Sequence, residues 1–309
     1  MAINPAMKMA LKALSYDVSK DNYKLRRTAS EIKGPHVLRP LYELWDKKIL
    51  VDDREITVRI YPAPKGCNQK LILFFHGGGW VTESINTYNN VCKSLAKRMR
   101  CRVASVEYGL APEHPFPHGL NDCYEVAKVI YTQPELFGVK KENITLIGDS
   151  AGGNLAAAVS LRARDTGEFS VPRQVLVYPA TFNNHSESSP FPSVKENGED
   201  YLLTSAAVCE YMKLYKSKDE DYDNPYFAPL LTKDFSNQPD TLVISAEFCP
   251  LRDEGEEYAR RLKIAGNKVS LYRMKDALHG FLSMGINFVQ VKTAYDLIAK
   301  FMNIEKRDY

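Results

Sequence analysis

The stretch Ile144-Thr145-Leu146-Ile147-Gly148-Asp149-Ser150-Ala151-Gly152-Gly153-Asn154 joins an apolar run to an Ala-rich segment that begins at Leu155. The apolar run predicts a buried strand, and the Ala-rich segment predicts a helix. Glycines on either side of Ser150 let the strand and the helix approach closely, so a strained turn can hold the serine at its tip. Such a turn exposes the Ser150 hydroxyl beside the Ala151 amide and the positive end of the helix. We therefore predict that Ser150 is a nucleophile.

Short apolar runs alternate with longer amphipathic segments on both sides of this turn. We expect strands at Lys48–Val51, Glu55–Tyr61, Leu71–Phe75, Arg102–Val106, Ile144–Ile147, Gln174–Tyr178, Thr241–Ser245 and Val269–Arg273. We expect helices near residues 85–99, 118–132, 152–165, 252–265 and 286–303. Strands and helices in alternation predict an α/β fold, with a mostly parallel sheet covered by helices on both faces.

Two segments break this alternation. Residues 1–45 carry helical patterns without a strand, and residues 183–225 open with a polar stretch that is followed by a helical pattern at Tyr201–Lys216. We predict that these segments form a cap, which leaves residues 46–182 and 226–309 as the core. Lys8 and Lys12 interrupt the apolar N-terminal stretch, so we expect a short amphipathic helix there rather than a signal peptide.

Composition excludes several classes of function. The chain has 309 residues with 41 Lys and Arg against 38 Asp and Glu, and this balance gives no reason to expect nucleic acid or an anionic membrane as partner. It has no apolar run long enough to span a membrane. Six cysteines without a CxxC pair fit neither a zinc site nor a disulfide framework, so we expect reduced thiols and a cytoplasmic protein.

A second motif, His76-Gly77-Gly78-Gly79-Trp80, directly follows the expected strand Leu71–Phe75. A serine nucleophile forms a tetrahedral intermediate, and hydrogen-bond donors must meet its oxyanion. Consecutive glycines leave backbone N–H groups open to a substrate. We predict that the N–H groups of Gly77, Gly78 and Ala151 form the oxyanion hole.

The serine also requires a base, and six histidines are available. His279 comes just after the last expected strand and follows Ser150 in the chain, which is the order expected for a nucleophile of this kind. We therefore predict that His279 is the base. Neither His114 nor His118 lies in an expected metal-binding helix, so no metal site is indicated. Surface positions are expected for His36 and His185.

Five motifs together resemble the hormone-sensitive-lipase-type family of α/β-hydrolases: His76–Trp80, Tyr108–Pro117, Gly148–Gly153, Pro250–Gly255 and His279–Phe281. The stretch Glu196–Thr204 is also similar to a cap helix of that family. The resemblance runs from about residue 70 to 285. It implies an α/β-hydrolase fold with an eight-stranded sheet, a cap over the serine, and hydrolysis of small carboxylic esters without a cofactor. Family members also tend to dimerise.

The chain departs from the family at two positions. Position 109 is Gly where the family usually has Arg, so one contact behind the site is expected to be missing. Cys249 occupies the position of the family's catalytic Asp, directly before Pro250. That acid normally fixes the tautomer of the catalytic His and stabilises its imidazolium form. Sulfur is a weak acceptor, so we expect Cys249 in the acid site to weaken catalysis.

Other groups near Cys249 are also candidates for the acid. Asp253 is ranked second, although it suits the N-cap of a helix over residues 254–263 as well. Glu247 matches a Glu common in the family and fits a structural role, while Asp276 fits a turn. A water molecule is a further candidate. The sequence leaves this choice open.

The expected cap and motifs carry aromatic residues that suit a small uncharged ester. We predict substrate contacts for Trp80, Tyr201 and Phe281, and acyl groups from acetyl to about hexanoyl. An amidase would use the same residues and would differ only in its substrate. The competing class is a non-catalytic binding protein on the same fold. Cys249 favours that class, whereas the retained Ser150, His279 and glycine triplet favour an enzyme.

Overall fold

The computed structural model describes Met9, Leu11 and residues 18–33, 45–51, 54–67 and 69–304. The helix predicted around Lys8 and Lys12 lies almost wholly outside the described residues, and so does His36. The sheet, the motif residues and the segment 183–225 are all within them.

Eight strands form one sheet in the order β1-β2-β4-β3-β5-β6-β7-β8. β2 runs antiparallel to β1 and to β4, and the other neighbours are parallel. The predicted α/β fold with a mostly parallel eight-stranded sheet is confirmed, and each expected strand overlaps an observed one. The strands are β1 Asp46–Val51, β2 Arg54–Tyr61, β3 Leu71–Phe75, β4 Arg102–Val106, β5 Ile144–Asp149, β6 Arg173–Val177, β7 Asp240–Phe248 and β8 Val269–Leu278.

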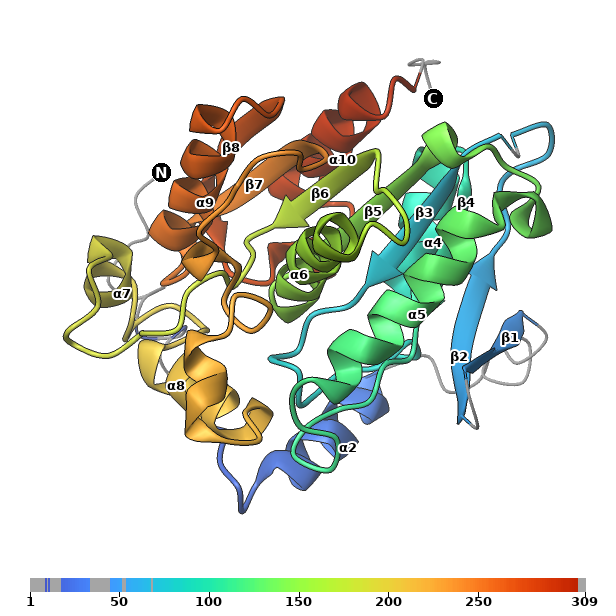
Figure 1. Cartoon of the computed structure of the whole chain (residues 1–309). Coiled ribbons are helices and arrows are strands. Elements are labelled where there is room, and N and C mark those ends of the chain that lie inside the picture. The colour runs from blue at the N-terminus through green and yellow to red at the C-terminus, as the bar shows by residue number, and fades with distance from the viewer. Residues whose placement is uncertain are drawn as a thin grey trace.

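Helices cover both faces of the sheet (Figure 1). One face carries α5 His118–Thr132, α6 Ala151–Thr166 and α9 Arg252–Ile264, and the other carries α4 Asn89–Arg98 and α10 Val289–Phe301. Because the central strands β3 and β5 are covered on both sides, every residue in them is buried, which accounts for their continuous apolar runs. None of the helices in the described part has the length and apolar character needed to cross a membrane.

The remaining helices gather beyond the carboxyl ends of the central strands (Figure 1). They are α2 Tyr23–Lys33, α7 Pro192–Glu196 and α8 Ser205–Tyr215. α8 begins later than the predicted Tyr201 because Thr204 caps it, with its hydroxyl oxygen accepting the Ala207 N–H at 3.0 Å. Arg27 anchors α2 to the core by donating to the carbonyl oxygens of Val81 and Ala111, both at 2.6 Å. Short 3₁₀ helices lie at Pro134–Phe137, Lys141–Asn143, Asp219–Asp223, Pro229–Leu231 and Phe281–Met284.

Strand β5 and helix α6 approach closely at the turn between them. A Cβ on Gly148 would lie 2.1 Å from the Gly152 carbonyl oxygen, and a Cβ on Gly152 would lie 2.1 Å from the Phe75 carbonyl oxygen. Neither position therefore has room for a side chain. Ser150, between them, adopts φ 54° and ψ −120°, a conformation that a serine rarely takes. The close approach of β3, β5 and α6 thus holds Ser150 in its strained turn.

We predict that Gly152→Ala lowers the free energy of unfolding by about 1–3 kcal/mol, because the added methyl group meets backbone atoms that cannot move aside. Urea denaturation measures the change. Gly255→Ala in α9 is the matched control, since its Cβ would come no closer than 3.3 Å to the Pro179 side chain and 3.7 Å to the Pro179 carbonyl oxygen. Equal losses in the two variants would contradict the steric explanation.

Candidate active site

Ser150, His279 and Cys249 meet at the carboxyl edge of the sheet, each directly after a strand: β5, β8 and β7, respectively. The Ser150 Oγ lies 2.9 Å from the His279 Nε2. The His279 Nδ1 lies 3.1 Å from the Cys249 Sγ, which also accepts the Leu251 N–H at 3.3 Å. The structure therefore brings a hydroxyl, an imidazole and a thiol, from distant parts of the chain, into one line of contacts.

Burial keeps both the imidazole and the thiol neutral. It lowers the pKa of His279 to about 3, and it raises the pKa of the Cys249 thiol well above its usual range. A neutral imidazole carries one proton. If that proton is on Nδ1 and points to the Cys249 sulfur, Nε2 is free to accept the Ser150 proton. The arrangement can therefore activate a serine without a carboxylate beside the histidine.

Asp253, the second candidate for the acid, is engaged elsewhere. Its Oδ2 accepts the Ser193 N–H at 2.7 Å, and its Oδ1 accepts from the Arg252 guanidinium at 2.7 Å. The N-cap interpretation is also wrong, because α9 begins at Arg252 and places Asp253 in its first turn. Of the two ranked candidates, it is Cys249 that contacts the His279 Nδ1.

Glu247 and Asp276 contact each other, since the Asp276 N–H donates to the Glu247 Oε2 at 2.7 Å. This bond joins β7 to β8 three residues before His279, so both residues support the loop that carries His279. Within the described residues, no group of three or more His, Cys, Asp or Glu side chains is placed to hold a metal ion.

The glycine loop differs from the prediction at one residue. The Gly77 N–H donates to the Asp149 Oδ1 at 3.0 Å, so the prediction that it serves the oxyanion hole is wrong. By contrast, the N–H groups of Gly78, Gly79 and Ala151 have no hydrogen-bond acceptor among the described residues. Ala151 is the first residue of α6, where an N–H has no acceptor within the helix. The structure leaves Gly78, Gly79 and Ala151 as the candidate donors.

The sequence did not identify Gly79 as a candidate oxyanion donor, because the residue type does not show which of three neighbouring glycine N–H groups faces the site. The direction in which each N–H points depends on the backbone dihedral angles. Gly78 and Gly79 have φ values of +109° and +60°, which residues other than glycine rarely adopt. A Cβ on Gly79 would also lie 2.3 Å from the Tyr211 ring of α8. Tyr211 therefore packs directly on the glycine loop.

The three residues predicted to contact substrate are mostly enclosed by other aromatic rings. Trp80 stacks on Tyr215 with ring centroids 4.5 Å apart, and Tyr201 stacks on Phe248 at 5.1 Å. Phe281 meets the Tyr178 ring edge-on at 5.1 Å. Because these rings are only 4%, 6% and 1% exposed, packing accounts for most of their surface.

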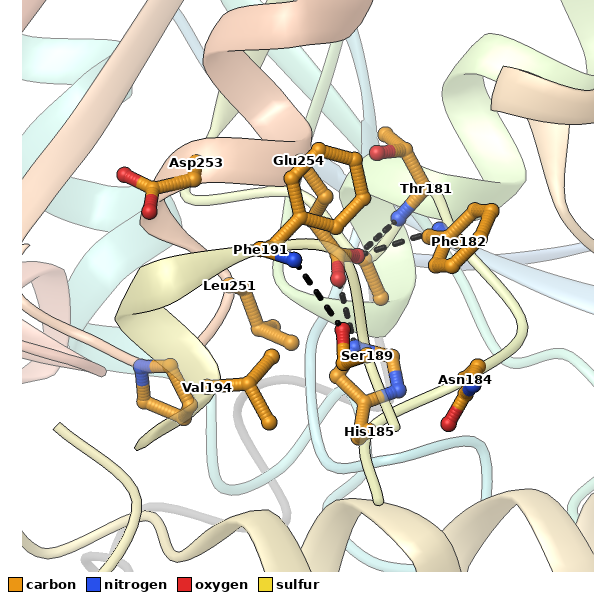
Figure 2. A network of polar contacts seen from close by, with 12 residues as sticks. Thr181, Phe182, Asn184, His185, Ser189, Phe191, Val194, Leu251, Asp253 and Glu254 are labelled. Carbon is orange, nitrogen blue, oxygen red and sulfur yellow. Dashed lines mark hydrogen bonds and ion pairs between the residues drawn. The ribbon is translucent and has the colours of Figure 1, made fainter. Parts of the chain in front are cut away.

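A buried network behind the Cys249 loop ties the segment after β6 to α9. Figure 2 shows Glu254 accepting hydrogen bonds from the backbone of Thr181 and Phe182, at 2.6 and 3.1 Å. The other Glu254 oxygen lies 2.5 Å from the His185 Nε2, and both side chains are fully buried. The expectation that His185 is a surface residue is therefore wrong. One carboxylate holds the start of the segment 183–225 against the core.

Gly109 packs against the His118 ring and the Asp122 carboxylate. A Cβ there would lie 2.5 Å from the His118 ring, so a larger side chain at position 109 would require that ring to shift. The Gly109 N–H donates to one oxygen of Asp122 at 2.8 Å, and Arg54 of β2 donates to the other at 2.7 Å. Both oxygens of Asp122 thus have a donor without an Arg at position 109.

A family model for the α/β-hydrolase fold matches residues 72–283, which is most of the chain. Together with the fold and the Ser150–His279 contact, this match shows that the chain belongs to the hormone-sensitive-lipase-type esterase family of α/β-hydrolases. The resemblance that the five motifs carry is confirmed.

Individual relatives extend the similarity beyond the motifs. An arylesterase of Saccharolobus solfataricus is 35% identical over 274 residues, which cover 88% of each chain. An ethyl acetate hydrolase of Pseudomonas putida is 33% identical over 76% of this chain and 74% of its own. The solved structure of a hyperthermophilic esterase from the archaeon Pyrobaculum calidifontis matches with a TM-score of 0.85, at 35% identity over 98% of both chains.

We predict that Glu254→Gln lowers the free energy of unfolding by about 3 kcal/mol. The glutamine amide has only one oxygen that can accept hydrogen bonds, and its NH₂ group would face one of the three donors. Urea denaturation measures the loss. Glu257→Gln on the same helix is the matched control; that carboxylate pairs with Arg260 near the surface, so its replacement costs less than about 1 kcal/mol. A Glu254→Gln variant as stable as the control would refute the assigned role.

Proposed function

We propose that this chain is a serine esterase that hydrolyses short, uncharged acyl esters, from acetyl to about hexanoyl. The observation that carries the proposal is the 2.9 Å contact between the Ser150 Oγ and the His279 Nε2, at a strand-to-helix turn. The family supports ester hydrolysis, and the names of the arylesterase and the ethyl acetate hydrolase support a small ester.

The reaction begins when His279 takes the proton of Ser150 and the serine oxygen attacks the acyl carbon. The N–H groups of Gly78, Gly79 and Ala151 hold the oxyanion of the tetrahedral intermediate. His279 then gives the proton to the departing alcohol, which leaves an acyl-enzyme on Ser150. A water molecule, activated by His279, releases the acid in the reverse sequence of proton transfers.

Cys249 takes the place of the acid in this scheme. Its sulfur accepts the Nδ1–H of His279 and so selects the tautomer that leaves Nε2 free. A neutral thiol does not balance the positive charge that forms on the imidazole, whereas a carboxylate does. We infer that the chain catalyses more slowly than an otherwise equal enzyme with a carboxylate at position 249.

The same proposal includes a cap, substrate contacts, a cellular location and an oligomeric state. Residues 1–45 and 183–225 act as a cap, and Trp80, Tyr201 and Phe281 meet the acyl group through the small part of their surface that packing leaves free. All six cysteines are unpaired in the structure, which supports a reducing, cytoplasmic location. A homodimer remains the expectation from the family.

A non-catalytic binding protein is the second candidate, and the neutral thiol at position 249 is the observation that favours it. The retained Ser150–His279 contact and the open N–H groups of the glycine loop favour the enzyme instead. A rate measurement separates the two, because a binding protein gives no turnover that depends on Ser150.

We predict that the purified protein hydrolyses p-nitrophenyl butyrate and that Ser150→Ala lowers kcat by at least about a thousandfold, since it removes the nucleophile. Initial rates measure both values, with circular dichroism to show that the variant is folded. A folded variant with the parent rate would rule out Ser150 as the nucleophile. If the parent has no rate above the variant, the binding protein becomes the better assignment.

We predict that Cys249→Asp raises kcat by about tenfold or more, because a carboxylate beside the His279 Nδ1 stabilises the imidazolium form. The same assay measures the change. Cys249→Ser is the control of similar size: its hydroxyl is a neutral acceptor, so its kcat stays within about tenfold of the parent. An unchanged kcat in a folded Cys249→Asp variant would show that charge at this position does not limit the reaction.

A further inference from the structure

The carboxylate of Asp149 lies directly behind the nucleophile and is surrounded by hydrogen-bond donors. Asp149 is the last residue of β5 and is 2% exposed. Its Oδ1 accepts the Gly77 N–H at 3.0 Å. Its Oδ2 accepts the hydroxyl of Tyr88 at 2.8 Å and that of Tyr178 at 3.3 Å. The scheme of catalysis proposed above gives this carboxylate no role.

Each of the three donors belongs to a different part of the site. Gly77 opens the glycine loop whose next two N–H groups are the candidate oxyanion donors. The Tyr178 ring packs against the His279 ring, with centroids 4.7 Å apart, and its hydroxyl oxygen accepts the Leu282 N–H at 3.2 Å. Tyr88 packs against the His76 ring at 5.5 Å. One carboxylate is therefore in contact with the oxyanion loop and with the ring that supports the base.

We propose that Asp149 is a positioning residue whose ionised carboxylate holds the oxyanion loop and the His279 support in place around Ser150, so that protonation of Asp149 turns the esterase down. The proposal rests on the serine esterase function proposed above. It assigns a regulatory device to the same site: activity follows the charge of a group that touches neither the substrate nor the reacting atoms.

The number of hydrogen-bond donors around Asp149 explains why its ionised form is needed to hold the oxyanion loop. The carboxylate has two oxygens and receives three hydrogens, and each of these bonds is strengthened by its charge. A protonated Asp149 adds a fourth hydrogen and removes that charge. The Gly77 N–H cannot accept a hydrogen bond, so only the tyrosine hydroxyls can rotate to receive it. Protonation therefore weakens the contacts that orient the Gly77 peptide and Tyr178.

The pKa of Asp149 lies inside the pH range over which esterase activity can be assayed. Burial raises its pKa to about 7, whereas burial lowers the pKa of His279 to about 3 and that of His76 to about 4. The other groups that interact with Asp149 electrostatically are Glu83, Tyr88, Cys92, Tyr108, Tyr178 and Tyr295. Burial raises the pKa of every tyrosine and of the cysteine in that set, so they stay neutral near pH 7.

Glu107 titrates in the same pH range as Asp149, because burial raises its pKa to about 7 as well. Its carboxylate accepts the Ile85 N–H at 2.9 Å. Glu107→Gln is therefore the matched control for Asp149→Asn: both variants replace a buried carboxylate that titrates in the same range, and only one of the two carboxylates contacts the oxyanion loop.

The test measures kcat and KM for p-nitrophenyl butyrate from pH 5 to 9, at a wavelength where p-nitrophenol and its anion absorb equally. The parent loses kcat as the pH falls through about 7, because the active form is the ionised one. Glu107→Gln keeps this fall. Asp149→Asn has a kcat that is lower by about tenfold at pH 8, with little change in KM, and that no longer varies across this range. A purely structural role would not remove the pH dependence.

Tyr178→Phe keeps the proposal testable if Asp149→Asn does not fold. The variant removes one donor to the carboxylate, so the fall in kcat moves to higher pH. A parent without a fall near pH 7, an Asp149→Asn variant that keeps it, or a Tyr178→Phe variant that leaves it unmoved would each overturn the proposal.

Covalent labelling separates this failure from failure of the proposed function. Diethyl p-nitrophenyl phosphate modifies activated serines, and intact-mass analysis with peptide mapping locates the adduct. A parent that is labelled at Ser150 and hydrolyses ester, yet shows no pH dependence near 7, contradicts only the role of Asp149. A parent that is neither labelled nor active contradicts the esterase function itself.

Discussion

The close approach of β5 and α6 is the constraint on which the site depends. Gly148 and Gly152 let the two backbones approach to a distance that no side chain allows, and the turn between them forces Ser150 into a strained conformation. From that turn the serine hydroxyl reaches His279, and the Ala151 N–H stands open beside it. The parallel sheet then supplies the other parts, because neighbouring strands end at the same edge and carry Cys249 and His279 there.

The charges of this site are distributed unusually. The two groups in line with Ser150 are neutral, because burial holds His279 unprotonated and Cys249 as a thiol. The carboxylate of Asp149, which directly precedes Ser150 in the chain, contacts the glycine loop through the Gly77 N–H. A site of this kind relies on the position of neutral groups more than on an ion pair. Precise support of the loop and of the base is correspondingly important.

Support also comes from helices around the sheet and from the segments that they hold. Tyr211 of α8 packs on Gly79, and Glu254 of α9 holds the backbone that leaves β6 together with His185 (Figure 2). Arg27 of α2 binds two carbonyl oxygens of the core. Segments that are far apart in the sequence thus reach the candidate site through individual polar and packing contacts.

The sequence by itself determined the fold and singled out Ser150 and His279, which the structure brings into contact. Buried parallel strands need continuous apolar runs, and a strained turn needs flanking glycines, so both leave local patterns such as Leu71–Phe75 and Gly148–Gly152. Only the tertiary structure decided which glycine amides face the site, which group contacts the His279 Nδ1, and that His185 is buried. These outcomes depend on the direction of single N–H groups and side chains, which is set by partners distant in the chain and leaves no local pattern.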